Sequence, residues 1–274
     1  MTACSNGQQA EWEPQNRKLC QILSGMGIET KEAEHIYAQT DDYAGTDKER
    51  ANDLMRFFRD TSVDAIFDIS GGDLANGILK DLNYEDIANT AKRFWGYSDL
   101  TTVINAIYTK TGKESVLYQV KNMVFSEGEL QRRRFSDYFS GKSNDLFDIQ
   151  YAFLQGKSME GVVIGGNIRC FLKLAGTEYW PDVKGKILLL ESLGGESGAI
   201  ATAFTQLEQL GVFDQISGVL LGTFTNYEKA GLKMSVFDLL KMHISETLPV
   251  AKTSEIGHGA DSKAIVIGRN MKLT

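Results

Sequence analysis

The stretch FWGYSDLTTVINAIYTKTG (residues 94–112) predicts a short strand that runs directly into a helix. Bulky aromatic residues open it, and four apolar residues between positions 100 and 107 then recur with the spacing of one helix face. Gly112 marks the end of this helix. A strand joined to a helix by so short a turn is typical of a parallel α/β layer.

The sequence before this stretch repeats the same alternation. TDKERANDLMRFFRD (46–60) has apolar residues at helical spacing, and VDAIFDIS (63–70) is a run of strand formers that ends at two glycines. YEDIANTAKR (84–93) predicts a further helix. Strands and helices in this order indicate a parallel sheet covered on both faces, so residues 1–125 are expected to form a Rossmann-like α/β domain.

The second half has a different pattern. Short apolar runs punctuated by glycine predict strands, and two longer segments predict helices: GVVIGGN (161–167), GKILLLE (185–191), SGVLLGTF (217–224) and KAIVIG (263–268) for strands, ATAFTQLEQLGVF (201–213) and VFDLLKMHI (236–244) for helices. We therefore expect a β-rich domain over residues 161–274. The charged segment 126–160 lacks a long apolar period and is predicted to be a linker or mobile segment.

Composition excludes several classes of protein. The 274 residues carry a net charge of -7, and the one dense basic cluster, RRR at 132–134, is interpreted as a solvated face, so no nucleic-acid partner is expected. The three cysteines are scattered and do not suggest a disulfide framework. No apolar run approaches the ~18 residues of a membrane span, and no signal peptide is recognisable, which favours a cytoplasmic protein.

Ser98 is the first candidate for chemistry. It lies between the predicted strand and helix, at the carboxyl end of the sheet, where ligands bind in open α/β folds. A helix N-terminus there would stabilise an oxyanion, and Gly96 permits a tight turn. The alternative is that Ser98 caps the helix, and taken alone the short Gly-x-Ser pattern favours the cap.

Three further positions have a functional and a structural interpretation. Gly71 and Gly72, in SGGDLANG (70–77), could direct N–H groups at an anion or a dinucleotide, or form a plain turn. Glu191 ends an apolar strand, either as a presented carboxylate or as a solvated strand end. His258, between two glycines, is either functional or a surface histidine.

No cofactor or metal site is expected. The chain has no HExxH motif, no Cys/His cluster and no Asp-rich loop, and His35 and His243 fall within helical patterns that explain them by packing or exposure. The remaining candidates together supply a nucleophile, a base, an acid to orient the base and N–H donors. Acyl transfer requires that set of groups.

These segments, in this order, resemble the LD-carboxypeptidase family of serine peptidases. The resemblance is carried by the stretch from AGTDKER to GGDLANGIL, then GYSDLTTVINAIY, GGN, GKILLLES, FTQLEQLGVF and IGHG, and it extends from about residue 45 to about residue 268. The family includes the muramoyltetrapeptide carboxypeptidases and the microcin C immunity peptidases. It has two domains, a parallel α/β layer bearing the serine and a β-rich domain bearing a glutamate and a histidine.

The resemblance implies a role for each candidate. Ser98 matches the nucleophile, His258 the base and Glu191 the acid, while the N–H groups of Gly72 and Asp99 match the oxyanion donors. Asn167, in GGN, matches a substrate-binding position that lines the cleft. The implied substrate is a small peptide with a C-terminal D-amino acid, such as a murein tetrapeptide in murein recycling, and the implied assembly is a homodimer.

Two departures from the family pattern keep other functions open. The opening strand is short, and the loop SLGGESGAIATAF after Glu191 lacks an arginine. A microcin C-type immunity peptidase that cleaves peptidyl or aminoacyl nucleotides is the first alternative, with Tyr138, Phe139 and Trp180 as possible stacking residues. A non-catalytic binding protein on the same fold is the second alternative, and nucleotide binding at residues 70–77 is the third.

Overall fold

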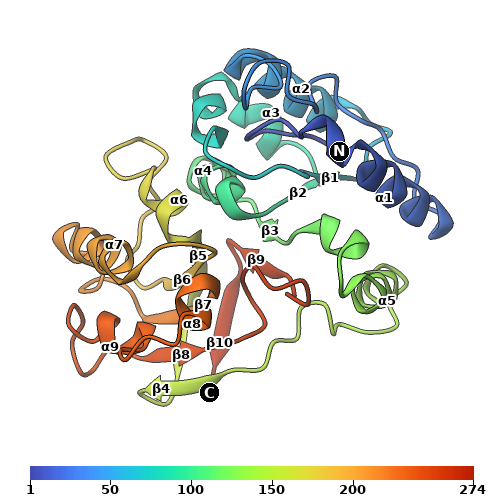
Figure 1. Cartoon of the computed structure of the whole chain (residues 1–274). Coiled ribbons are helices and arrows are strands. Elements are labelled where there is room, and N and C mark those ends of the chain that lie inside the picture. The colour runs from blue at the N-terminus through green and yellow to red at the C-terminus, as the bar shows by residue number, and fades with distance from the viewer.

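Two sheets form the centre of the molecule, as the computed structural model of residues 1–274 shows (Figure 1). The first sheet has four strands in the order β1 (Ala65–Phe67), β2 (Arg93–Gly96), β3 (Ser115–Leu117) and β9 (Ile265–Ile267). β1, β2 and β3 are parallel, and β9 is antiparallel to β3. The expected parallel layer is therefore present in the N-terminal half.

The second sheet has six strands and belongs to the C-terminal half. Their order is β10 (Asn270–Leu273), β5 (Met159–Asn167), β6 (Ile187–Ser192), β7 (Gly218–Phe224), β8 (Val250–Lys252) and β4 (Ala152–Gln155). β5 to β8 are parallel, while β10 and β4 close the edges in antiparallel orientation. The α/β class with a second, strand-rich domain is thus confirmed.

Helices surround both sheets. The α-helices are α1 (Glu13–Gly25), α2 (Asp47–Arg59), α3 (Tyr84–Ala88), α4 (Thr101–Thr111), α5 (Gly128–Phe139), α6 (Ile168–Leu172), α7 (Ser197–Gln209), α8 (Thr225–Lys229) and α9 (Val236–Leu240). Four short 3-10 helices are η1 (Ala10–Trp12), η2 (Ala75–Asp81), η3 (Ser98–Leu100) and η4 (Val120–Val124). No helix combines the length and apolar character needed to cross a membrane.

The N-terminal residues lie beside β1. Thr2 forms a parallel bridge with Asp68, and its N–H donates to the Phe67 carbonyl at 3.0 Å. The buried Asp68 carboxylate accepts hydrogen bonds from the Thr2 hydroxyl, the Cys4 N–H and the Ser70 N–H. These contacts tie the chain start to the turn after β1, because a buried carboxylate is costly unless donors surround it.

The segment 126–160 differs from the predicted linker or mobile segment. It contains α5 and β4, and Phe135 of α5 is fully buried against Phe67, Trp95 and Tyr118. The segment packs on the core through a few aromatic side chains that lie among charged residues. For this reason the sequence shows no long apolar period there. The domain boundaries at residues 125 and 161 stay a prediction.

The two halves share one core. Along β5, β6 and β7 the side chains alternate between the faces of the sheet. Val163, Leu189 and Leu220 belong to the larger cluster that contains the core of the N-terminal half, whereas the neighbours of these residues pack against α7 and α9. β9, from the predicted C-terminal domain, lies beside β3 in the first sheet (Figure 1). The shared core and the pairing of β9 with β3 fix the position of one sheet relative to the other.

Replacing Phe135 by Ala tests the packing of α5. We expect Phe135→Ala to lower the free energy of unfolding by about 3–5 kcal/mol, because it empties a buried aromatic site. Phe139→Ala is the matched control on the same helix, since Phe139 is 47% exposed and should cost clearly less. Urea unfolding measures both changes. Equal, small effects would show that α5 does not contribute to the core.

Candidate active site

Ser98 occupies a sharp turn between β2 and α4. Its backbone φ is 53°, one of two positive values among the non-glycine residues. Gly96 makes this turn possible, because a Cβ atom there would lie 2.7 Å from the Leu100 Cβ. Ser98 begins η3, its side chain makes no capping hydrogen bond, and Tyr97 is the N-cap. The structure therefore excludes the helix-cap interpretation and leaves the Ser98 hydroxyl free for another partner.

That partner is His258. The His258 Nε2 lies 3.2 Å from the Ser98 Oγ, and the His258 Nδ1 lies 2.6 Å from the Glu191 Oε2. The Glu191 side chain is fully buried and the His258 side chain is 6% exposed, so neither is a solvated strand end or a surface histidine. The other carboxylate oxygen of Glu191 is buried without a hydrogen-bond partner. The charge of Glu191 is thus directed at one ring nitrogen.

The loop that carries His258 is held by two hydroxyls. The Tyr97 hydroxyl donates to the Gly257 carbonyl at 3.2 Å, and the Ser262 hydroxyl donates to the same carbonyl at 2.6 Å. The Tyr97 ring also lies against the imidazole, with 4.4 Å between ring centroids. Burial, and secondarily the charge of Glu191, raise the pKa of Tyr97 well above its usual value, which keeps this hydroxyl a donor.

The Gly71–Gly72 turn lies beside Ser98. A Cβ atom on Gly71 would come within 3.8 Å of the Ser98 Cβ. Gly72 has φ 122°, and a Cβ there would collide with the Asn6 side chain at 2.2 Å, so only glycine fits. The Gly72 N–H donates to no protein group. The Asp99 N–H belongs to the first turn of a helix, where N–H groups lack intrahelical acceptors.

A buried polar network fixes this region from behind. The fully buried Asp99 carboxylate accepts hydrogen bonds from the Ser5 hydroxyl at 2.7 Å, the Ala75 N–H at 2.8 Å and the Lys173 ammonium at 2.5 Å. Its donors come from three distant parts of the chain. Because the carboxylate is fully satisfied, the backbone of Asp99 has little freedom to move.

Two cavities meet at Ser98 and Gly72. One, of about 430 Å³, is lined mainly by the N-terminal half and includes Trp12 and Lys121. The other, of about 600 Å³, is lined mainly by the C-terminal half and includes Asn167 and Arg169. Substrate groups on both sides of a scissile bond could therefore be held at once, with the Ser98 hydroxyl between them.

Asn167 lies on the wall of the larger cavity. It ends β5 directly opposite Glu191 of β6, at the carboxyl edge of the sheet. Its side-chain carbonyl caps α6 by accepting from the Cys170 N–H at 3.3 Å. The side-chain NH₂ donates to no protein group, which leaves it for a bound molecule.

This arrangement can perform nucleophilic chemistry on a carbonyl group. Comparison with models of protein families matches residues 1–118 to the LD-carboxypeptidase N-terminal domain and residues 160–273 to the LD-carboxypeptidase C-terminal domain. The chain belongs to the LD-carboxypeptidase family. The two matches cover most of the chain and leave out a stretch that contains α5 and β4.

Relatives in this family carry two kinds of name. A Bacillus subtilis protein described as a probable murein peptide carboxypeptidase is 27% identical over 257 residues, covering 90% of this chain and 80% of its own length. The microcin C7 self-immunity protein MccF of Escherichia coli is 28% identical over 240 residues, covering 75% of this chain and 69% of its own. Relatives with these two kinds of name thus have similar sequence identity to this chain.

Solved structures support the same fold. MccF in complex with aspartyl sulfamoyl adenosine superposes with a TM-score of 0.88 at 21% identity, over 99% of this chain and 91% of that one. Muramoyltetrapeptide carboxypeptidase from Oxalobacter formigenes superposes with a TM-score of 0.80 at 19% identity, over 100% and 94% of the two chains. At these identities the likeness concerns the fold alone.

Several residues that surround the candidate site could not be selected from the sequence. Lys173 reaches Asp99, Arg169 pairs with Asp73 at the turn after Gly72, and Lys121 and Trp12 line the smaller cavity. None of them belongs to a motif that chemistry alone would select. Only the folded chain shows that they are neighbours of Ser98.

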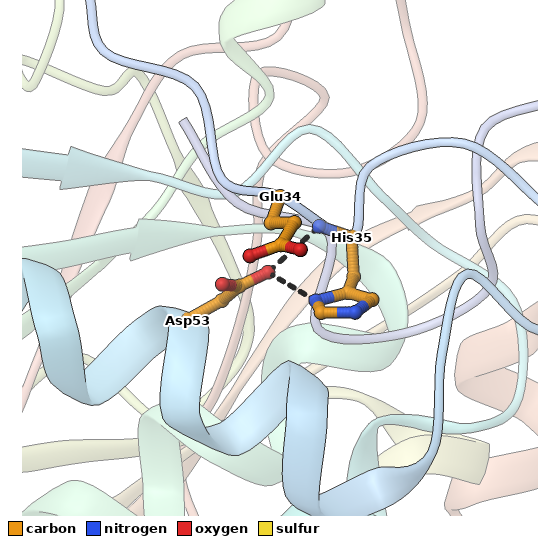
Figure 2. A group of neighbouring side chains, drawn as sticks. All are labelled: Glu34, His35 and Asp53. Atoms are coloured by element: carbon orange, nitrogen blue, oxygen red, sulfur yellow. Dashed lines mark hydrogen bonds and ion pairs between the residues drawn. The ribbon is translucent and has the colours of Figure 1, made fainter.

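A second cluster of ionisable side chains lies outside the cleft, where Glu34, His35 and Asp53 have potential metal-ligating atoms within 4.8 Å of one another (Figure 2). Asp53 accepts from the His35 N–H at 2.8 Å and faces the His35 Nδ1 at 3.0 Å, while its other oxygen accepts from Arg56. Asp53 thereby ties the loop before α2 to that helix. The helical position expected for His35 is wrong, because this loop is non-helical.

The backbone strain at Ser98 can be measured directly. We expect Ser98→Gly to be more stable than Ser98→Ala by about 1 kcal/mol, because both lose the hydroxyl and only glycine adopts a positive φ without strain. Thermal or urea unfolding of the two variants gives the difference. A Ser98→Ala protein as stable as Ser98→Gly would contradict the strained turn.

Proposed function

We propose that this chain is a serine carboxypeptidase that hydrolyses the amide bond to the C-terminal D-amino acid of a murein tetrapeptide. The observation that carries the proposal is the hydrogen-bonded series from Ser98 through His258 to the buried Glu191. Membership of the LD-carboxypeptidase family supports the substrate class. Murein recycling in the cytoplasm and assembly as a homodimer belong to the same proposal and rest on the family resemblance.

The reaction starts at the Ser98 hydroxyl. His258 Nε2, at 3.2 Å, accepts the hydroxyl proton as the oxygen attacks the amide carbonyl. Glu191 accepts the Nδ1–H at 2.6 Å, which fixes the required tautomer and stabilises the imidazolium as it forms. Because Glu191 is buried and engaged by this one donor, its charge acts on the imidazole with little screening by water.

The developing negative charge lies on the former carbonyl oxygen. The N–H groups of Gly72 and Asp99 are the donors we assign to it, and each such donor is worth about 3–4 kcal/mol in comparable sites. The Asp99 network and the Asn6 side chain keep both backbones in place before the substrate arrives. Preorganised donors of this kind lower the barrier because they need no rearrangement in the transition state.

Three proton transfers complete the cycle. The imidazolium of His258 protonates the leaving amine, and the C–N bond breaks to give an acyl ester on Ser98 and a free amino acid. His258 then takes a proton from a water molecule as the water oxygen attacks the ester carbonyl. The same N–H groups bind the oxyanion that forms. The bond between the acyl carbon and the Ser98 Oγ breaks, Ser98 takes the proton from His258, and the shortened peptide leaves as a carboxylic acid, so the enzyme returns to its starting state.

The first alternative keeps the chemistry and changes the substrate to a peptidyl or aminoacyl nucleotide, as the complex of MccF with aspartyl sulfamoyl adenosine suggests. Stacking of a nucleobase would require an aromatic residue in the cleft. Tyr138, Phe139 and Trp180, the residues selected from the sequence, line neither cavity. Trp12 and Phe125 line the smaller one, but they pack edge to face against each other. The aromatic residues selected from the sequence thus give the nucleotide substrate no stacking surface in either cavity.

Ser98→Ala tests the serine mechanism. We expect the variant to lose at least about 10³-fold in kcat on a murein tetrapeptide, because no other nucleophile faces His258. Release of the D-amino acid, followed by mass spectrometry, measures the rate, and Ser24→Ala on the exposed face of α1 is the matched control. A Ser98→Ala rate near that of the wild type would exclude this mechanism.

The wild-type protein also separates the alternatives. Cleavage of an aminoacyl nucleotide without cleavage of the tetrapeptide would select the immunity-type substrate. Failure to cleave either one, together with failure of a serine-reactive phosphonate to label Ser98, would favour a binding protein on the same fold.

A further inference from the structure

The smaller cavity contains a buried lysine that the proposed mechanism does not use. Lys121, at the start of η4, is 6% exposed and lines the cavity that also includes Ser98 and Gly72. Its ammonium donates to the Gln8 side-chain carbonyl and lies 4.6 Å from the centroid of the Trp12 ring. Gln8 and Trp12 thus hold the ammonium in one position on the cavity wall.

Lys121 has no acidic partner. No carboxylate lies within 4.0 Å of its ammonium, and burial lowers its pKa to about 8. A charged group out of water normally needs a counter-charge, so an unpaired ammonium on a cavity wall is energetically unfavourable until an anion enters.

The other cavity differs in this respect. Its one cationic side chain, Arg169, forms an ion pair with Asp73 and donates to the Gly72 carbonyl at 3.1 Å. Lys173, nearby, is engaged by Asp99. Lys121 is therefore the one lysine or arginine that lines either cavity without a carboxylate partner.

We propose that Lys121 binds the free carboxylate of the substrate's C-terminal residue and so selects peptides that end one residue beyond the scissile bond. The inference rests on the proposed carboxypeptidase function and assigns the leaving amino acid to the smaller cavity. A volume of about 430 Å³ suits a single terminal residue, and about 600 Å³ remains on the other side of Ser98 for the rest of the peptide.

The surroundings of Lys121 suit a carboxylate. Gln8 and Trp12, its two neighbours, are neutral, so they position the ammonium and do not compete for the anion. The other ionisable groups on this cavity include Asp42, which is exposed, and His258, which already faces Glu191. A carboxylate that enters the cavity therefore finds one unengaged positive charge.

A pair of substrates tests the assignment. We would compare a tetrapeptide that ends in free D-alanine with the same peptide ending in D-alanine amide, using the wild type and Lys121→Met. The wild type should prefer the acid by at least about tenfold in kcat/KM. Lys121→Met should lose about 10- to 100-fold on the acid and little on the amide, because only the acid uses the ammonium.

Two further variants sharpen this experiment. Lys142→Met removes an exposed lysine remote from the cleft and should leave both rates unchanged. Lys121→Arg keeps the charge and should retain most of the preference for the acid. An equal loss on both substrates in Lys121→Met would indicate a purely structural role and overturn the proposal, as would an unchanged preference.

The pH dependence of the acid-to-amide preference provides a second readout. Since the pKa of Lys121 lies at about 8, the ratio of the two kcat/KM values should fall as pH rises through about 8 and the ammonium loses its proton. His258, Asp42 and Tyr97 also line the cavity, so the same ratio is measured for Lys121→Met, in which the fall should be absent. A ratio that stays constant from pH 7 to pH 10 would contradict the assignment.

Binding to an inactive protein separates this inference from the proposed function. In a Ser98→Ala background, calorimetry should show tighter binding of the acid than of the amide, and Lys121→Met should abolish the difference. If the wild type hydrolyses neither peptide, the proposed function fails, and the calorimetry alone then decides the role of Lys121. Binding of an aminoacyl phosphoramidate that depends on Lys121, without such dependence for the peptide acid, would overturn the carboxylate assignment.

Discussion

One face of the second sheet packs on the N-terminal half, and the active-site geometry depends on that contact. Val163, Leu189 and Leu220 project from β5, β6 and β7 into the same core as the helices and strands of the first domain. Protein interiors are close-packed, so the two sheets cannot rotate without opening cavities. The 3.2 Å contact between Ser98 and His258, which lie 160 residues apart, is therefore set by the core and not by a free hinge.

Behind Ser98, two buried carboxylates and their hydrogen-bond donors fix the backbone close to the nucleophile. The Asp99 carboxylate accepts hydrogen bonds from Ser5, Ala75 and Lys173. The Asp68 carboxylate accepts hydrogen bonds from Thr2, Cys4 and Ser70. Each buried carboxylate is acceptable only while its donors stay in place. The two networks consequently fix the chain start, the Gly71–Gly72 turn and the turn at Ser98 against one another, with no need for a long first strand.

Much of the fold and of the candidate site could be predicted from the sequence. Whether a residue could be selected depends on whether it belongs to a local pattern. The strands that end at Gly96 and, one residue after Glu191, at Ser192 follow from runs of apolar residues. A parallel sheet places such ends where ligands bind. His258 could be selected because it lies between glycines, although the resemblance to a family was needed to pair it with Ser98. These residues belong to local patterns that remain visible before folding.

Other features have no local signature. Phe135 is a core residue in a charged segment, and its burial depends on Phe67 and Trp95 from distant strands. Lys121 resembles any surface lysine in the sequence, and only its contacts with Gln8 and Trp12 show that it is buried. The three proposed catalytic residues lie at or beside strand ends or in a loop tied to them, whereas the walls of the smaller cavity come largely from loops and short helices. Loops vary in sequence more readily than sheets. Placing the catalytic residues at strand ends and the cavity walls on loops therefore lets the chemistry stay constant while the group recognised beside Ser98 changes.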